Sequence, residues 1–332
     1  TASSSASPVI DINYHVFVRV KNLTLKEGQM GLKVRRNGIA LISNSIVESN
    51  SGDGICACGT SFMFSESNTI RNNSGNGIYA TDNAEVNIKS NTISGHSGGS
   101  SITITQGAYA IINSNTITGS SGNTAVEISR GTSATIKSNT IQSAYIGISV
   151  QDSSHAILKN NTVNSNSSSG LRADNNASVI LAEGNTFSNN SGYGIRVWLA
   201  GSLVMWGNSQ LTSPTTISGN TKGPIRVDEG GSAYLSNLTL ASQSKGIIIQ
   251  NGNFVKLDNV TITGSGEYGI NVWGTNIGLE DSTISGSTDT EIFAKFSTIN
   301  LEKTAITGTA GSDEIELNYG SMLFIGTGTT IT

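Results

Sequence analysis

Arginine, aspartate and tryptophan recur at matching places in three successive segments near the middle of the sequence. Each segment alternates these residues with aliphatic ones, and the six residues are Arg172 and Asp174, Arg196 and Trp198, and Arg226 and Asp228. Paired carboxylates hydrolyse glycosidic bonds, and a tryptophan ring offers a flat, amphipathic platform for a sugar ring. The segments therefore define a candidate glycan site made of Trp198 and the three arginines, with Asp174 and Asp228 as candidate catalytic residues.

The alternation predicts β-strands whose aliphatic residues face inward and whose polar residues face outward. If the segments stack as neighbouring strands, Asp174 and Asp228 lie about 9.6 Å apart with Trp198 between them. That distance is close to the upper end of the separation of about 6.5–9.5 Å found in inverting glycosidases. Alternatively, the arginines and aspartates of neighbouring strands neutralise one another, and the tryptophan ring covers the aliphatic parts of their side chains. The residues favour this surface pairing over glycan binding, and glycan binding over catalysis.

An internal repeat supplies the strands that would position these residues. The tripeptide Asn-Thr-Ile, or a close variant, begins at Asn68, Asn91, Asn115, Asn139, Asn161 and Asn185. The steps between these asparagines are 23, 24, 24, 22 and 24 residues, and weaker copies extend the series in both directions. One longer step of 30 residues, from Phe187 to Ile217, predicts a loop insertion at residues 206–216.

Each period contains three short apolar alternations, which predict three short strands per turn. Such strands bury little by themselves, but stacked turns pair in parallel and enclose a continuous core. The sequence therefore predicts a single all-β solenoid domain over residues 1–332, with about thirteen coils of 22–24 residues. Residues 1–8 form a polar leader in this interpretation.

The repeat resembles the pectin-lyase-like right-handed parallel β-helix superfamily. The resemblance rests on the Asn-Thr-Ile segments and on turns such as Asn72-Asn-Ser-Gly-Asn-Gly-Ile78, and it covers essentially the whole chain. It implies a right-handed parallel β-helix with an internal asparagine ladder, whose side chains bond from coil to coil. The expected ladder residues are Asn44, Asn68, Asn91, Asn115, Asn139, Asn161 and Asn185.

Catalytic signatures of that superfamily are missing from the sequence. It contains no cluster of aspartates like that of the pectate lyases, no Gly-His-Gly of the polygalacturonases and no Asp-Pro-His of the alginate epimerases. His15, His96 and His155 stand alone and are expected to face solvent. The sequence therefore favours a role without catalysis, and no cofactor or metal site is expected.

Composition restricts the partners and the location. With 13% charged residues and a net charge of -4, the chain offers no electrostatic attraction for nucleic acid, and no apolar run is long enough for membrane insertion. The Ser/Thr/Asn-rich composition and the start at Thr1 suggest an extracellular or cell-surface protein. Cys56 and Cys58 are expected to be free thiols rather than an intermolecular bridge or a metal site, because their strand spacing is awkward for a disulfide.

A rank of threonines runs along the first strand of the repeat. Its members precede the apolar position of each coil and are Thr24, Thr69, Thr92, Thr116, Thr140, Thr162, Thr186, Thr216, Thr239, Thr261, Thr283 and Thr330, interrupted by Ser45 and Ala305. The rank resembles the Thr-x-Thr faces of ice-binding β-solenoids, and that hypothesis predicts measurable thermal hysteresis. Threonine also simply suits exposed strands, and this second interpretation is favoured.

The two ends of the solenoid suggest assembly. Neither end shows a helical or charged cap, and an uncovered strand edge recruits other chains. The sequence therefore predicts a structural solenoid that binds copies of itself head to tail, and laterally through the threonine rank. A polysaccharide-binding or polysaccharide-degrading protein is the alternative, and an ice-binding protein is the third. The expected assembly residues are Val9, Ile10, Ile12, Leu323, Ile325 and Ile331.

Overall fold

A computed structural model describes residues 7–205, 213–309, 311 and 313–332 as a right-handed parallel β-helix with three sheets. The chain divides into two compact units, residues 1–167 and 168–332. Each unit contains seven turns, so the chain has about one turn more than expected. Most of the predicted leader and of the predicted insertion at 206–216 lies outside the described residues. None of the described residues forms a helix long and apolar enough to cross a membrane.

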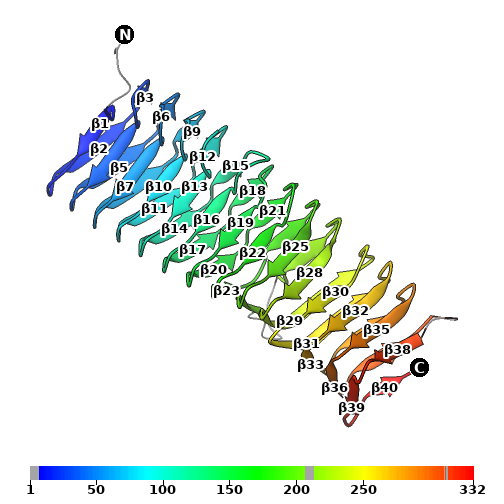
Figure 1. Cartoon of the computed structure of the whole chain (residues 1–332). Helices are drawn as coiled ribbons and strands as arrows, with labels where there is room; N and C mark the ends of the chain where they lie inside the picture. The colour runs from blue at the N-terminus through cyan, green and yellow to red at the C-terminus, as the bar shows by residue number, and fades with distance from the viewer. Residues whose placement is uncertain (1–6, 206–212, 310, 312) are drawn as a thin grey trace. The chain divides into compact units, whose positions relative to one another are not determined.

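In the first unit each turn contributes one strand to each sheet (Figure 1). Sheet A contains β1 (Ile10–Ile12), β4 (Leu32–Arg35), β7 (Ile55–Cys58), β10 (Ile78–Ala80), β13 (Ile102–Ile104), β16 (Val126–Ile128) and β19 (Ile148–Val150). Sheet B contains β2 (Phe17–Lys21), β5 (Ile39–Ser43), β8 (Phe62–Glu66), β11 (Glu85–Lys89), β14 (Tyr109–Asn113), β17 (Ser133–Lys137) and β20 (His155–Lys159). Sheet C contains β3 (Thr24–Lys26), β6 (Ile46–Glu48), β9 (Thr69–Arg71), β12 (Thr92–Ser94), β15 (Thr116–Thr118), β18 (Thr140–Gln142) and β21 (Thr162–Asn164).

The second unit repeats this arrangement. Sheet A contains β22 (Leu171–Ala173), β25 (Tyr193–Val197), β28 (Gly223–Asp228), β30 (Ile247–Gln250), β32 (Tyr268–Trp273), β35 (Thr290–Lys295) and β38 (Asp313–Asn318). Sheet B contains β23 (Ser178–Leu181), β26 (Ser202–Met205), β33 (Asn276–Glu280), β36 (Thr298–Glu302) and β39 (Met322–Ile325). Two long strands, β29 (Ser232–Ala241) and β31 (Phe254–Thr263), continue from sheet B into sheet C. The remaining strands of sheet C are β24 (Thr186–Ser188), β27 (Thr216–Ser218), β34 (Thr283–Ser285), β37 (Ala305–Thr307) and β40 (Thr330–Ile331).

Inward positions form columns of aliphatic side chains from turn to turn. In the first unit, Ile93 pairs in register with Ile70 and Ile117, and all three are completely buried. Identical side chains stacked in this way fill the narrow interior without gaps and hold the register of every strand above and below. The fold class expected from the repeat is confirmed.

The asparagine ladder lies at the corner between sheets B and C. The Oδ1 atoms of Asn91, Asn115 and Asn139 each accept a hydrogen bond from the backbone amide of the preceding ladder residue, at 2.8–3.0 Å. The residue before each asparagine has a left-handed backbone, such as Ser90 with φ 54°. These bonds pair corner amides that would otherwise be buried without partners.

One expected ladder residue was wrong. Asn44 is exposed and has a φ of 49°, whereas Ser45 is buried and its amide bonds Asn68 Oδ1 at 2.9 Å. Asparagine tolerates the left-handed backbone conformation that the corner requires, so Asn44 takes the corner position. The next residue, Ser45, therefore takes the ladder position. The same shift puts Ile46, not Ser45, in the threonine rank, and Val47 in the core.

A second ladder, not anticipated from the sequence, lies at the corner between sheets C and A. In the first unit the Asn73 Oδ1 accepts bonds from Asn50 N and Nδ2 at 3.1 and 2.8 Å. In the second unit Asn190 and Asn220 are linked in the same way, at 3.1 and 2.9 Å. The glycine that opens many sheet A strands faces this ladder, because a Cβ on Gly194 would lie 2.8 Å from Asn220 Nδ2.

Candidate functional site

Three arginines form a column on the outer face of sheet A in the second unit. Arg172, Arg196 and Arg226 pair in register on β22, β25 and β28, as the repeat predicted. Their side chains are about one quarter to one third exposed. The aliphatic residues that alternate with them, such as Ile195 and Val197, are completely buried in the core. Strand pairing therefore fixes these three positions, called the arginine column below, along the axis of the unit.

The two candidate carboxylates lie beneath the guanidinium groups. Asp174 and Asp228 are only 3% and 2% exposed, although both were expected to face outward. Arg172 Nε lies 2.9 Å from Asp174 Oδ2, and Arg196 Nη2 lies 3.2 Å from Asp228 Oδ2. Arg226 Nε also bonds Asp228 Oδ2. Burial and ion pairing make these carboxylates anchors for the arginines and leave guanidinium groups as the accessible surface.

The arginines are held by further contacts that limit their freedom. Arg226 donates hydrogen bonds to Tyr193 Oη and Gln250 Oε1, both at 3.0 Å. Burial would lower the pKa of Arg226, but the hydrogen bonds with Tyr193 and Asp228 outweigh it and raise this pKa. The group therefore remains cationic at all ordinary pH values.

Trp198 completes this surface. The Arg196 guanidinium carbon lies 4.5 Å from the centroid of the Trp198 ring, which is a cation–π contact. Within the described part of the chain, Trp198 Nε1 and the buried Asp228 Oδ1 have no hydrogen-bond partner. A buried donor and a buried acceptor without partners are unusual, and both belong to this site.

The same outer face continues with aromatic residues that the sequence analysis did not single out. Asp228 pairs with Gln250, and Gln250 pairs with Trp273, whose ring lies 5.0 Å from Lys295 Nζ. Two of the three tryptophans of the chain thus lie on one face of the second unit. Sequence spacing contained the signal, because Trp198 and Trp273 each lie four residues after the glycine that opens a strand.

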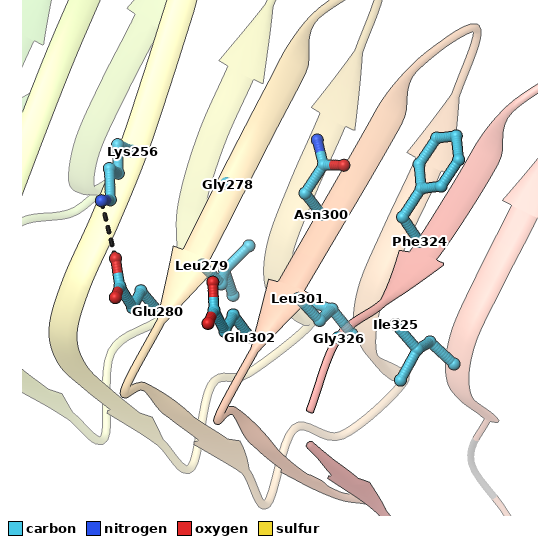
Figure 2. Close-up of a pocket in the computed structure, with 10 residues that line it drawn as sticks. All are labelled: Lys256, Gly278, Leu279, Glu280, Asn300, Leu301, Glu302, Phe324, Ile325 and Gly326. Atoms are coloured by element: carbon cyan, nitrogen blue, oxygen red, sulfur yellow. Dashed lines mark hydrogen bonds and ion pairs between the residues drawn. The ribbon is translucent and has the colours of Figure 1, made fainter. Parts of the chain in front are cut away.

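A second candidate is a hollow of about 340 Å³ on the outer face of sheet B, called the Gly278 hollow (Figure 2). Gly278 leaves a gap between Lys256 and Asn300, and a Cβ there would meet no atom within 4 Å. Figure 2 shows Lys256 pointing to Glu280, with which it pairs at 2.7 Å, and Glu302 beside it. The bond from Lys256 lowers the pKa of Glu280. The hollow offers hydrogen-bonding groups to a polar ligand. However, it is open to solvent, and it lies on sheet B, whereas the arginine column lies on sheet A.

The other predicted residues occupy separate places. The threonine rank is in register on sheet C, for example Thr92 with Thr116 and Thr116 with Thr140. The expected assembly residues lie at the outer turns, where Val9, Ile325 and Ile331 are exposed, Ile10 and Leu323 are half-buried, and Ile12 is buried.

Cys56 and Cys58 lie on β7 and form no disulfide within the chain. Each thiol shifts the pKa of the other: Cys58 raises the pKa of Cys56, and Cys56 lowers the pKa of Cys58 to about 7. His96 is buried, so its expected exposure to solvent was wrong.

Comparisons with known proteins agree with this architecture. The family model described as right handed beta helix region matches residues 9–97, 59–221 and 223–325. The crystal structure of the periplasmic alginate epimerase AlgG superposes with a TM-score of 0.59 at 11% identity, over 90% of this chain and 78% of that chain. The catalytic unit of a GH87 alpha-1,3-glucanase from Streptomyces thermodiastaticus superposes with a TM-score of 0.45 at 14% identity, over 89% and 63% of the two chains. No curated protein matches the sequence. At 11% identity the likeness to AlgG concerns the fold alone.

Proposed function

We propose that this chain, which belongs to the right-handed β-helix family, binds an acidic polysaccharide at the arginine column and Trp198. The observation that supports the proposal is the register of Arg172, Arg196 and Arg226 above two buried aspartates. Guanidinium groups bind carboxylates with two parallel hydrogen bonds, which matches the acidic groups of a uronic acid polymer. Because ion pairs already hold these arginines, binding would cost little additional side-chain entropy.

The proposal is binding rather than catalysis. The carboxylates that could act on a glycosidic bond are buried and paired with arginine. The sequence also lacks the Asp-Pro-His of alginate epimerases, so the structural likeness to AlgG is not extended to epimerisation. We also propose that the protein is extracellular or at the cell surface, because acidic polysaccharides of this kind occur there.

The experiment measures retention of the purified chain on immobilised uronic acid polymers and on neutral glucans. We expect the wild type to bind the acidic polymers, and Trp198→Ala and Arg196→Gln each to weaken binding by about tenfold or more, roughly 1.4 kcal/mol. Trp273→Ala tests whether the ligand extends along the column. Phe254→Ala is the matched control, because Phe254 is 52% exposed but lies on sheet B.

Two results would contradict the proposal. One is a wild type that binds no glycan on an array. The other is a loss of binding in Gly278→Tyr, which fills the Gly278 hollow, without any loss in Trp198→Ala. The second result would place the glycan on sheet B.

Self-association is a second candidate function, supported by one observation at the last turn. Ile325 and Ile331 are 56% and 38% exposed, whereas the residues that pair with them one turn earlier, Leu301 and Ile306, are buried. A further turn stacked on this one would bury both side chains. A second copy, docking its first turn, is the partner that we propose.

A further inference from the structure

Two thiols lie side by side on the outer face of sheet A in the first unit. Cys56 and Cys58 belong to β7, and the residues between and before them, Ala57 and Ile55, are completely buried in the core. Alternation along the strand therefore places both cysteines on the opposite, outer face. Cys56 is 4% exposed and Cys58 is half-buried.

The spacing of the two residues is poor for a disulfide. Positions two apart on a strand are separated by roughly 6.6 Å, at the upper limit of about 6.8 Å between the Cα atoms of disulfide-bonded cysteines. A metal ion relaxes this constraint, because two metal–sulfur bonds of about 2.3 Å span sulfur atoms up to about 4.6 Å apart. A single ion between the sulfurs therefore fits the strand better than a direct bond.

The number of nearby ligands selects the kind of ion. Among the residues that the structure describes, no group of three or more histidine, cysteine or acidic side chains could hold a metal ion. Zinc sites use four ligands, and calcium and magnesium take oxygen ligands, so neither chemistry fits two thiols. Thiolates alone favour soft ions such as Cu(I), which is stable with two sulfur ligands.

Charged side chains of both signs surround the pair. Lys33 and Arg35 pair in register with Cys56 and Cys58 from β4, and Arg35 is also bound to Asp11 at 2.7 Å. Lys33 lowers the pKa values of both thiols, whereas Asp53 raises that of Cys56 and Asp82 raises that of Cys58. A monovalent ion held by two thiolates has a net charge of -1, which the two adjacent cations attract.

We propose that Cys56 and Cys58 together form a two-coordinate site for a soft monovalent metal ion, Cu(I) or Ag(I). Binding forms two metal–sulfur bonds and releases one proton from each thiol, and no electron is transferred. The site is independent of the proposed glycan face, which belongs to the other unit.

The test titrates the reduced full-length chain with Ag(I), which is soft and does not change its oxidation state under these conditions. Native mass spectrometry should show one ion per chain, and alkylation of the half-buried Cys58 by iodoacetamide should be blocked at one equivalent. Cys56→Ser and Cys58→Ser should each weaken binding by about a hundredfold or more, because a single thiolate lacks the chelate. Circular dichroism confirms that each variant is folded, and the double serine variant gives the background.

Several results would overturn the site. Equal affinity in either single variant would show that one thiol binds alone, and two ions per chain would show the same. A mass loss of two hydrogens on mild oxidation, with no Ag(I) bound by the reduced chain, would show that the pair forms a disulfide instead. Cys58→Ser is the decisive variant because its side chain is half-buried and the change is nearly isosteric.

Discussion

His96 occupies a corner position that asparagine holds in neighbouring turns. It is 3% exposed and follows Asn50 and Asn73 in the second ladder, and a Cβ on Gly77 would lie 2.6 Å from its Nε2. Burial lowers the pKa of His96 from 6.5 to about 4, although the backbone carbonyls of Asn73 and Ile70 partly offset this effect. A neutral imidazole is thus built into the core of the first unit.

The His96 pKa predicts a specific loss of stability in acid. The unfolded chain binds a proton at this residue below pH 6.5, whereas the folded chain resists protonation until about pH 4. The contribution to stability is therefore complete above pH 6.5 and is lost as the pH falls from 6.5 to 4, by roughly 3 kcal/mol. Urea unfolding at pH 7, 5.5 and 4 should show this loss in the wild type and a smaller loss in His96→Asn. Identical pH dependence in both proteins would show that His96 does not titrate between the two states.

At the scale of the coil, strands and corners depend on different interactions. Ile117 is completely buried in the core column of sheet C. Asn115, two residues earlier, belongs to the asparagine ladder at the corner between sheets B and C, where its side chain forms hydrogen bonds with backbone groups. Its Nδ2 donates to the Ile88 carbonyl at 2.9 Å, and its Oδ1 accepts from Asn91 N at 2.8 Å. Thr116, between them, faces outward and has neither role.

These differences predict a graded response to substitution within three residues. Ile117→Asp buries an unpaired charge and should lower the free energy of unfolding by several kcal/mol. Asn115→Ala leaves corner amides buried without hydrogen-bond partners and should lower it by about 1–3 kcal/mol. Thr116→Ser is the control and should change little. Thermal unfolding measured by circular dichroism ranks the three variants. If Ile117→Asp melts like the wild type, the assignment of inward and outward positions is wrong.

The threonine rank is also a property of the coil. Members such as Thr92, Thr116 and Thr140 pair in register on sheet C, and Ile46 interrupts the rank in the first unit. Threonine suits such exposed positions whatever the function. Ice binding by this face stays a prediction.

At the scale of the whole molecule, the proposed self-association would bury apolar side chains of the outer turns rather than pair charges. Burial of Ile325 and Ile331 against the first turn of a second copy would extend the core and continue the parallel backbone bonding. A heterologous contact of this type generates filaments.

Sedimentation velocity at increasing concentration tests this assembly. The wild type should form larger species, and Ile331→Lys should remain a monomer with the circular dichroism spectrum of an intact β-helix, because a lysine at the joint would be buried without a partner. Thr140→Ser, on the side of the solenoid, is the control. A wild type that stays monomeric throughout would contradict end-to-end assembly, and it would leave the glycan proposal unaffected.

The repeat determined the strands, the stacking and the register of the arginine column. A period of 22–24 residues with three alternations fits few architectures, and a one-residue slip would turn every aliphatic side chain outward. Arg172, Arg196 and Arg226 could therefore be aligned without coordinates. The first asparagine ladder was implied by the resemblance to the pectin-lyase-like superfamily, and it is present apart from Asn44.

Only the tertiary structure decided what surrounds each outward position. The alternation treats Asp174 and Asp228 like any other outward residue, yet longer arginines fold over them and exclude water. His96 and the second ladder lie in corners, where no short period distinguishes a buried side chain from an exposed one. The Gly278 hollow exists because one side chain is missing between two neighbouring turns. Apart from the ion pairs of Arg172 with Asp174 and of Arg226 with Asp228, these features depend on contacts between residues more than twenty positions apart, which local periodicity does not specify.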